Sequence, residues 1–382
     1  MIDKANVVII GGGISGVSIA YNLAKKGMKD IVVVEKNYLA SGATGRCGAG
    51  VRAQWGTEMN CKIALASIDF YENADEILEY ERGIDFHQGG YLILAATEKE
   101  DEQFKKNLEI QNRLGVPSRR LTKEETKGII SYVNTDDVVS ATFSPTDGHV
   151  NPFKATDAYA LAAERLGVKI YKYTEVSDII VESGKVKKVI TNKGDIETNI
   201  VVNAAGGYSK EIAEMVGIDL PVYSERHQIL VTEPVKDMQG PMIIAFYKNL
   251  YCQQTPEGSF IMGRSGEDEP TDLRMTSSWD FLDKMAKTIT HTLPPIAELT
   301  FIRQWAGLYN MTEDRQPIYG ETRDLKGFYQ AVGFSGHGFM FAPMTGLLIA
   351  EQIMGEENTI DISSLSLERF EKGELVFEPS VV

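Results

Sequence analysis

Residues 7–16 read VVIIGGGISG, a short apolar run followed directly by a glycine-rich turn. The apolar run predicts a buried strand, and Gly11, Gly13 and Gly16 have the spacing G-x-G-x-x-G. At this spacing the first glycine permits a tight turn and the second lets the backbone approach a pyrophosphate. The third lets a helix pack closely on the strand. The stretch therefore predicts the opening of a dinucleotide-binding sheet.

The residues after this turn complete a strand–helix–strand unit. The helix is expected to begin at Ile14 and Ser15, whose N–H groups would point at the phosphates. The next strand, residues 31–34, leads into Glu35 and Lys36. Glu35 lies about 20 residues after the glycines, where a carboxylate accepts hydrogen bonds from ribose hydroxyls. A carboxylate there disfavours a 2′-phosphate, so NADP is the less favoured ligand.

The composition argues against nucleic acid or a membrane as partner. The 382 residues carry a net charge of -15, which disfavours binding to a phosphate backbone or an anionic membrane surface. No stretch approaches the roughly 20 apolar residues of a membrane span, and the opening residues show no signal-peptide pattern. The 3 cysteines form no CxxC and the 5 histidines no HExxH, so no metal site is expected. We expect a soluble, cytoplasmic protein.

Segments of two kinds alternate along the chain. Strands like the first one are expected at 200–204 and 328–332, and the second precedes a helix from about Pro343 to Met354. An amphipathic helix is expected at residues 98–113. Antiparallel strands with turn signals between them are expected near residues 89–96, 226–234 and 249–265.

This alternation predicts an α/β fold with two parts. A Rossmann-like, doubly wound nucleotide-binding sheet is interrupted by a β-rich (α+β) substrate domain. The predicted nucleotide-binding domain comprises residues 1–85, 146–215 and 304–382. The predicted substrate domain comprises residues 86–145 and 216–303.

Four motifs occur in order: LASGATGRCGAGVRAQWG at 39–56, VVNAAGGYS at 201–209, RQWAGLYNMTEDRQPIYG at 303–320 and GFSGHGFMFAPMTG at 333–346. This ordered set resembles the D-amino-acid-oxidase type of FAD-dependent oxidoreductases over essentially the whole chain. Within that group it is most similar to sarcosine oxidases, their β subunits, and the β subunit of heteromeric dye-linked L-proline dehydrogenase. The resemblance implies that the nucleotide is FAD and that the substrate is a small amino acid with a secondary amine.

The resemblance also assigns residues to the FAD site. They are Ala43, Thr44, Gly45, Gly48, Val176, Ala205, Gly206, Gly307, Gly336, His337, Gly338, Phe339 and Met340. Reduction of a flavin puts negative charge on its N1–C2=O edge, and a glycine-rich turn before a helix supplies N–H groups that stabilise this charge. The alternative is that the GFSGHGF turn merely closes the sheet.

Three residues are candidates for the catalytic centre. An amino-acid substrate needs a fixed cation for its carboxylate, and the resemblance places Arg52 in that role. It places Tyr251 in the active site and His337 beside the flavin. Arg52 could instead be a surface arginine paired with an acid, and Tyr251 could serve only as part of the core.

Three departures from the sarcosine oxidase pattern bear on the chemistry. Met340 stands where those enzymes carry a lysine, so a second cation is missing, and Arg303 is a possible substitute. Ile261 and Met262 occupy the neighbourhood of the lysine associated with oxygen activation, which weakens an oxidase reading. The stretch 151–160 lacks the histidine that attaches FMN in heterotetrameric sarcosine oxidase, so any FMN at a subunit interface would be non-covalent.

The sequence therefore predicts an FAD-dependent dehydrogenase that oxidises L-proline, or a similar secondary amino acid, to its imine by hydride transfer. It would be the catalytic subunit of a heteromeric complex with an α-type partner and a separate electron acceptor. One alternative is a sarcosine- or glycine-type amine oxidase that uses oxygen. Another, of a different class, is a subunit that keeps FAD for assembly or electron relay.

Overall fold

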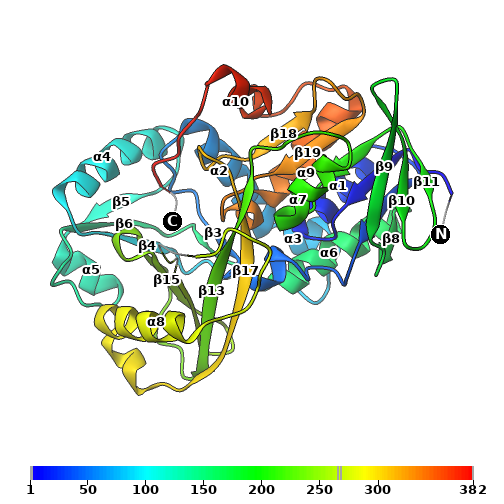
Figure 1. The fold of residues 1–382 in the computed structure, drawn as a ribbon. Helices are drawn as coiled ribbons and strands as arrows, with labels where there is room; N and C mark the ends of the chain where they lie inside the picture. Colours follow the sequence, from blue (N-terminus) through cyan, green and yellow to red (C-terminus); the bar gives the residue numbers. More distant parts are fainter. Residues whose placement is uncertain (1–2, 265, 267–268, 381–382) are drawn as a thin grey trace.

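The structure is a computed structural model that describes residues 3–264, 266 and 269–380. Both ends of the predicted nucleotide-binding domain, and residues 265, 267 and 268 of the predicted substrate domain, thus lie outside the described residues. Two large sheets form the molecule, and the long strands β13 and β17 run through its middle between the two halves (Figure 1). The fold is the predicted mixed α/β fold.

The first large sheet is six-stranded, and its strands are parallel except for β18, which runs antiparallel to β19. In spatial order they are β18 (Ile318–Glu321), β19 (Phe328–Val332), β12 (Val201–Asn203), β1 (Val7–Ile10), β2 (Ile31–Glu35) and β8 (Lys169–Lys172). Every residue of β1 and β2 is buried, because both faces of this sheet are covered, as continuous apolar strands predict. The strands expected at residues 7–10, 31–34 and 328–332 are confirmed, and that expected at 200–204 is shorter.

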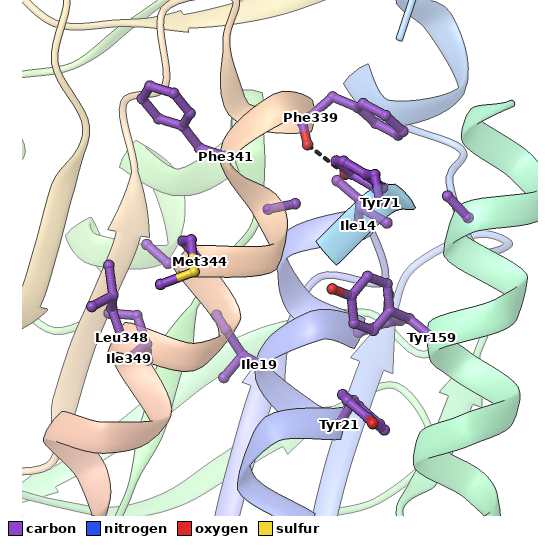
Figure 2. Close-up of a cluster of buried hydrophobic side chains, with 14 of the residues drawn as sticks. Ile14, Ile19, Tyr21, Tyr71, Tyr159, Phe339, Phe341, Met344, Leu348 and Ile349 are labelled. Carbon is purple, nitrogen blue, oxygen red and sulfur yellow. Dashed lines mark hydrogen bonds between the residues drawn. The ribbon is translucent and has the colours of Figure 1, made fainter. Parts of the chain in front are cut away.

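Helices cover one face of this sheet and a small sheet covers the other. The first face packs against helices α1 (Ile14–Lys25), α6 (Pro152–Arg165) and α9 (Gly338–Met354). In Figure 2, Ile19 of α1 points towards Met344 and Leu348 of α9. The opposite face packs against a three-stranded sheet of β9 (Val176–Glu182), β10 (Lys185–Thr191) and β11 (Ile196–Glu197).

The last long helix begins earlier than the sequence predicts. Pro343 was expected near its first residue, but α9 begins at Gly338 and contains Pro343. Proline lacks the N–H that would bond the carbonyl four residues back, which is that of Phe339. The Tyr71 hydroxyl donates to this carbonyl instead, at 2.8 Å (Figure 2), so the helix continues through the proline. As a result the N-terminus of α9 lies directly after the GFSGHGF turn.

The second large sheet is eight-stranded and antiparallel except where β14 pairs with β4. In spatial order its strands are β17 (Phe301–Met311), β13 (Tyr223–Pro234), β16 (Ser259–Arg264), β15 (Leu250–Gln254), β14 (Met242–Ala245), β4 (Tyr91–Ala95), β6 (Ser140–Ser144) and β5 (Arg119–Leu121). One face packs on α8 (Trp279–Thr292), and α4 (Glu98–Arg113) contributes Phe104 to the other. The expected helix at 98–113 is confirmed. The remaining α-helices and strands of the described chain are α2 (Glu58–Glu72), α3 (Ala74–Ile77), α5 (Lys123–Ile129), α7 (Ser209–Glu214), α10 (Glu368–Lys372) and the paired strands β3 (Gly50–Val51) and β7 (Gly148–His149).

The division into two domains stays a prediction, but strand pairing bears on one boundary. The predicted boundary at 303/304 falls inside β17, which pairs with β13 along most of its length. The sheet to which β17 belongs is determined by its pairing with β13, which a change in the local residue pattern does not reveal. None of the described helices is long and apolar enough to cross a membrane.

Candidate active site

The glycine turn after β1 has the geometry that the motif requires. Gly11 has a φ of 118°, and a Cβ there would lie 2.3 Å from the Ala204 oxygen. A Cβ on Gly16 would lie 2.0 Å from the Gly11 oxygen, so this glycine serves the packing of α1 on β1. At Gly13 a Cβ would meet only Thr44 Oγ1, at 3.1 Å, which leaves room for a ligand at the helix N-terminus.

Glu35, at the end of β2, is held firmly by its surroundings. One carboxylate oxygen accepts from the N–H of Gly12 at 2.8 Å, and the other from the N–H of Asn37 at 2.8 Å and from Ser41 Oγ at 3.3 Å. Each oxygen of an ionised carboxylate can accept more than one hydrogen bond. The fixed carboxylate can therefore still accept from ribose hydroxyls in the adjoining cavity.

A cavity of about 160 Å³, here called the nucleotide cavity, joins these elements. Of the residues predicted to bind the cofactor, it is lined by Gly11, Gly13, Ile14, Ser15, Glu35, Ala43, Thr44, Ala205, Gly206, Gly336, Gly338 and Phe339. Three of the others lie elsewhere. Lys36 lies over the Tyr208 ring, 3.0 Å from its centroid, Val176 belongs to the core behind the sheet, and Gly307 packs against Arg46.

The turn before α9 brings backbone N–H groups to the same cavity. Gly336 has a φ of 95°, and a Cβ there would lie 2.4 Å from the Tyr309 ring. The turn leads into the N-terminus of α9, which is 17 residues long. Such an end favours negative charge, so the residues present fit a flavin whose N1–C2=O edge becomes negative on reduction.

A second cavity of about 80 Å³, here called the small cavity, adjoins the first, since both are lined by Cys47, Tyr309 and Gly336. Arg52, Tyr251 and His337, the three predicted catalytic residues, all line the small cavity, and so does Met340. They come from segments far apart in the sequence. The structure therefore brings the predicted catalytic residues together beside the predicted cofactor site.

Arg52 is a buried cation that forms no salt bridge with an acid among the described residues. Its side chain is 4% exposed, and its guanidinium donates to the main-chain oxygens of Gln54 and Ser380 and lies 3.8 Å from the Trp55 ring. Burial lowers the pKa of Arg52 from its usual value, and the nearby Tyr91, Glu378 and Asp147 oppose this effect. No salt bridge forms between Arg52 and any described acid, so the surface-arginine alternative is wrong. A buried cation of this kind is stabilised by an anionic ligand such as a carboxylate.

The segment after α10 helps to hold Arg52 in place, which sequence reasoning missed. This segment runs back towards α4 (Figure 1), where the Asn107 side chain donates to Ser380 Oγ at 3.0 Å. The buried Glu378 carboxylate accepts from the Gly56 N–H at 2.8 Å and from the Asn60 side chain at 2.9 Å, at the start of α2. The Ser380 oxygen thereby reaches the Arg52 guanidinium.

Asp147 supports the same loop from the other side. It is fully buried and accepts from the Ala53 N–H at 2.9 Å and from Gln54 Nε2 at 3.0 Å. Burial raises the pKa of Asp147 to about 6 against these hydrogen bonds. Asp147 therefore positions the residues that directly follow Arg52.

His337 and Tyr251 are both in neutral forms near pH 7. His337 is 2% exposed and packs against the rings of Trp55 and Phe341, and burial followed by the charge of Arg52 lowers its pKa to about 3. Neither ring nitrogen of His337 has a described partner. Burial raises the pKa of Tyr251 well above its usual value, and its ring packs against Gly48. Tyr251 also belongs to a hydrophobic cluster, so it is part of the core and of the lining of the small cavity at once.

A third cavity of about 420 Å³, here called the outer cavity, shares Cys47 and Gly48 with the small cavity. It contains Gly45 and Gly48 of the predicted cofactor residues, and Gln253, which donates to the Gly48 oxygen at 2.7 Å. Arg303, the suggested substitute for the missing lysine, is exposed and lines this cavity and not the small one. It is therefore not placed to share a ligand with Arg52.

Sequence reasoning also missed other residues that line the small cavity. They are Trp55, Tyr91, Met242, Ile244, Tyr309 and Ser335. Trp55, Tyr309 and Ser335 fall inside the motifs, which was the available signal. Tyr91, Met242 and Ile244 lie on strands, and the sheet register decides which side chains of these strands point to the cavity. No group of three or more His, Cys, Asp or Glu that could hold a metal ion occurs in the described part of the chain.

The nucleotide cavity adjoins a small cavity that contains a buried cation, and this arrangement fits a flavin with an amino-acid substrate beside it. Residues 6–352 match the family of FAD dependent oxidoreductases, and the chain belongs to this family. It is therefore an FAD-dependent amine or amino-acid oxidoreductase.

Individual relatives agree with this assignment. An L-proline dehydrogenase structure from P. horikoshii is 38% identical, with a TM-score of 0.93 and coverage of 98% of this chain and 100% of that one. The sarcosine oxidase subunit beta of Rhodobacter capsulatus is 28% identical over 98% of this chain and 91% of its own length. The glycine oxidase structure from Geobacillus kaustophilus is 26% identical, with a TM-score of 0.88 and coverage of 96% and 99%. The resemblance inferred from the motifs is confirmed.

Proposed function

We propose that this chain oxidises L-proline, or a similar secondary amino acid, to its imine as the catalytic subunit of a heteromeric dehydrogenase. The observation that carries the proposal is Arg52, a buried cation that lacks an acidic partner in the described chain and faces a small cavity beside the cofactor cleft. An amino-acid carboxylate supplies the missing anion. The similarity to an L-proline dehydrogenase favours proline over sarcosine.

FAD, when bound, supplies the hydride acceptor. Arg52 holds the substrate carboxylate, which fixes the orientation of the Cα–H bond. Apolar and neutral side chains such as Ile244, Met340 and His337 exclude water and favour the uncharged amine, because burial disfavours the ammonium form. The substrate nitrogen needs only to lose its proton before the transfer, so no general base is required.

The proposal includes a partner chain and a second electron carrier. A relative is named as a subunit beta, which supports an α-type partner for this chain. The outer cavity is large enough for a planar ligand and contains Arg46, Arg303 and the exposed Phe153, so it is the candidate position for a non-covalent FMN at the subunit interface. Electrons would then leave through the outer cavity.

The alternative is a sarcosine- or glycine-type amine oxidase. The similarity to a glycine oxidase supports it, whereas Ile261, which lines the outer cavity, provides no lysine for oxygen activation. Turnover with proline in the presence of an artificial dye is compared with turnover in air-saturated buffer with peroxide detection. Fast dye reduction with little peroxide supports the dehydrogenase. Stoichiometric peroxide, formed at a rate comparable to that of dye reduction, favours the amine oxidase instead.

The substrate is tested by anaerobic titration of the FAD-loaded chain with L-proline, sarcosine, glycine and D-alanine. The proposal expects L-proline to bleach the flavin at the lowest concentration. Bleaching by sarcosine or glycine in preference to proline would overturn the proline assignment. A flavin that none of the four reduces would favour the remaining alternative, an FAD-containing assembly or electron-relay subunit.

A further inference from the structure

Tyr91 is a buried residue that lines the small cavity. This residue begins β4 and is 1% exposed, and its main-chain oxygen accepts from Gln54 Nε2 at 3.1 Å. The hydrogen bonds among the described residues include none from its hydroxyl, and the residue lines the small cavity. Buried tyrosine hydroxyls normally find a hydrogen-bond partner. A ligand in the small cavity is therefore the natural partner of this hydroxyl.

The backbone opposite Tyr91 leaves space for this phenol. A Cβ on Gly50 would lie 1.6 Å from the Tyr91 hydroxyl oxygen and 2.9 Å from the ring carbon that carries it. Any other residue at position 50 would therefore displace the phenol. The glycine allows Tyr91 to reach the segment of chain that carries Arg52 two residues further on.

Electrostatics distinguish Tyr91 from the other two tyrosines of the small cavity. Burial raises the pKa of Tyr91, and the charge of Arg52 is the largest influence that opposes this rise. For Tyr251 and Tyr309, burial and other tyrosine, cysteine or glutamate side chains raise the pKa, and Arg52 is not among the causes. Because such influences weaken with distance, Arg52 acts more strongly on the phenol of Tyr91 than on those of Tyr251 and Tyr309. With a raised pKa, the hydroxyl remains a donor at working pH.

The small cavity also lacks a second donor at the expected place. Met340 lines it where the resemblance predicts a lysine, and a thioether has no N–H to donate. Two of the five N–H groups of the Arg52 guanidinium are used by the Gln54 and Ser380 oxygens. A second donor beside Arg52 would complete the binding of a carboxylate.

We propose that the Tyr91 hydroxyl donates a hydrogen bond to the carboxylate of the amino-acid substrate and acts with Arg52 in place of the lysine that is absent at Met340. The inference rests on the proposed function, because it needs an amino acid in the small cavity. Tyr91 is thus a substrate-binding residue. The contact exists in the ground state and the transition state alike, so its loss raises KM more than it lowers kcat.

The test separates binding of the carboxylate from binding of the ring. FAD-loaded wild type and Tyr91→Phe are titrated with two ligands, and the change in flavin absorbance gives each Kd. Tetrahydrofuran-2-carboxylate keeps the carboxylate of proline but has oxygen in place of nitrogen, whereas pyrrolidine keeps the nitrogen and lacks the carboxylate. Tyr159→Phe is the matched control, because Tyr159 is also 1% exposed but lies in the core beside α1.

We expect Tyr91→Phe to raise the Kd of tetrahydrofuran-2-carboxylate about tenfold, as for loss of a hydrogen bond to a charged group. The Kd of pyrrolidine and the FAD content should stay at the wild-type values, and Tyr159→Phe should resemble wild type with both ligands. An unchanged Kd for the carboxylate ligand, or an equal rise for pyrrolidine, overturns the inference alone. A wild-type protein that binds neither ligand overturns the proposed function as well.

Discussion

The nucleotide cavity and the small cavity adjoin, but they are built from different parts of the chain. The nucleotide cavity is made largely of backbone from local motifs, with glycines such as Gly11, Gly13 and Gly336 at the points of close approach. The small cavity is made of side chains, and Arg52, Tyr91 and Tyr251 reach it from three separate strands or loops.

This difference predicts how each cavity responds to substitution. A site built from backbone presents its N–H groups regardless of which side chains surround it. A single side-chain substitution therefore weakens cofactor binding only in part. A side-chain site with one buried cation depends on that cation, since removal of one member of a buried charge pair leaves the other without a partner. The largest effects should therefore come from the small cavity, and they should appear in substrate kinetics.

Arg52→Ala should give the largest loss. We expect kcat/KM for the amino acid to fall by an amount equivalent to about 2–5 kcal/mol, mostly through KM, because the substrate carboxylate loses its buried cation. Steady-state kinetics with an artificial dye measure the fall, and flavin absorbance shows whether FAD is retained. Near-normal kinetics would show that another group holds the carboxylate, and Arg303→Ala then tests the exposed arginine of the outer cavity.

Glu35→Gln probes the nucleotide cavity in the same way. Loss of charge-assisted hydrogen bonds to ribose should weaken FAD by about 1.5–3 kcal/mol, while KM of the reconstituted protein changes little. The Kd of FAD for the apoprotein measures this, with Glu182→Gln, an exposed residue at the end of β9, as the control. Unchanged FAD affinity would remove Glu35 from the ribose site. The flavin should also be released on denaturation, and covalent flavin in the precipitate would contradict non-covalent binding.

The same difference explains how much could be predicted from the sequence. Gly11, Gly13 and Glu35 follow from spacing, because a strand–turn–helix unit positions them with no help from the rest of the chain. Arg52, Tyr251 and His337 were found only through a resemblance. Tyr91 and Ser380 gave no signal. The position of Tyr91 depends on sheet register. Ser380 belongs to a tail that contacts Arg52, a residue more than 300 positions earlier in the sequence. The start of α9 was missed because Tyr71 satisfies the carbonyl freed by Pro343.

Glu378→Gln tests whether the tail positions Arg52. The carboxylate accepts hydrogen bonds at the start of α2, so we expect a loss of stability of about 1–2 kcal/mol. KM should rise together with this loss, because the Ser380 oxygen no longer orients the guanidinium. Chemical denaturation and steady-state kinetics measure the two effects, and Glu374→Gln on the exposed part of the same tail is the control. A loss of stability with unchanged KM would make the tail purely structural.

Of the four substitutions, His337→Asn should have the smallest effect, and the property to measure is the pH dependence of the reaction. Burial and the charge of Arg52 lower the pKa of His337 to about 3, so the neutral form is favoured in the folded chain. The stability linked to this residue is complete above its ordinary pKa of 6.5 and is lost as the pH falls towards 3. Between pH 6 and 9 the imidazole of the folded wild type therefore carries no charge. The pH profile of kcat/KM should keep the same inflection points in His337→Asn as in the wild type. If an inflection near pH 6–7 disappears in His337→Asn, the histidine titrates during catalysis and exchanges protons with the substrate, and the small cavity is then more polar than its apolar lining indicates.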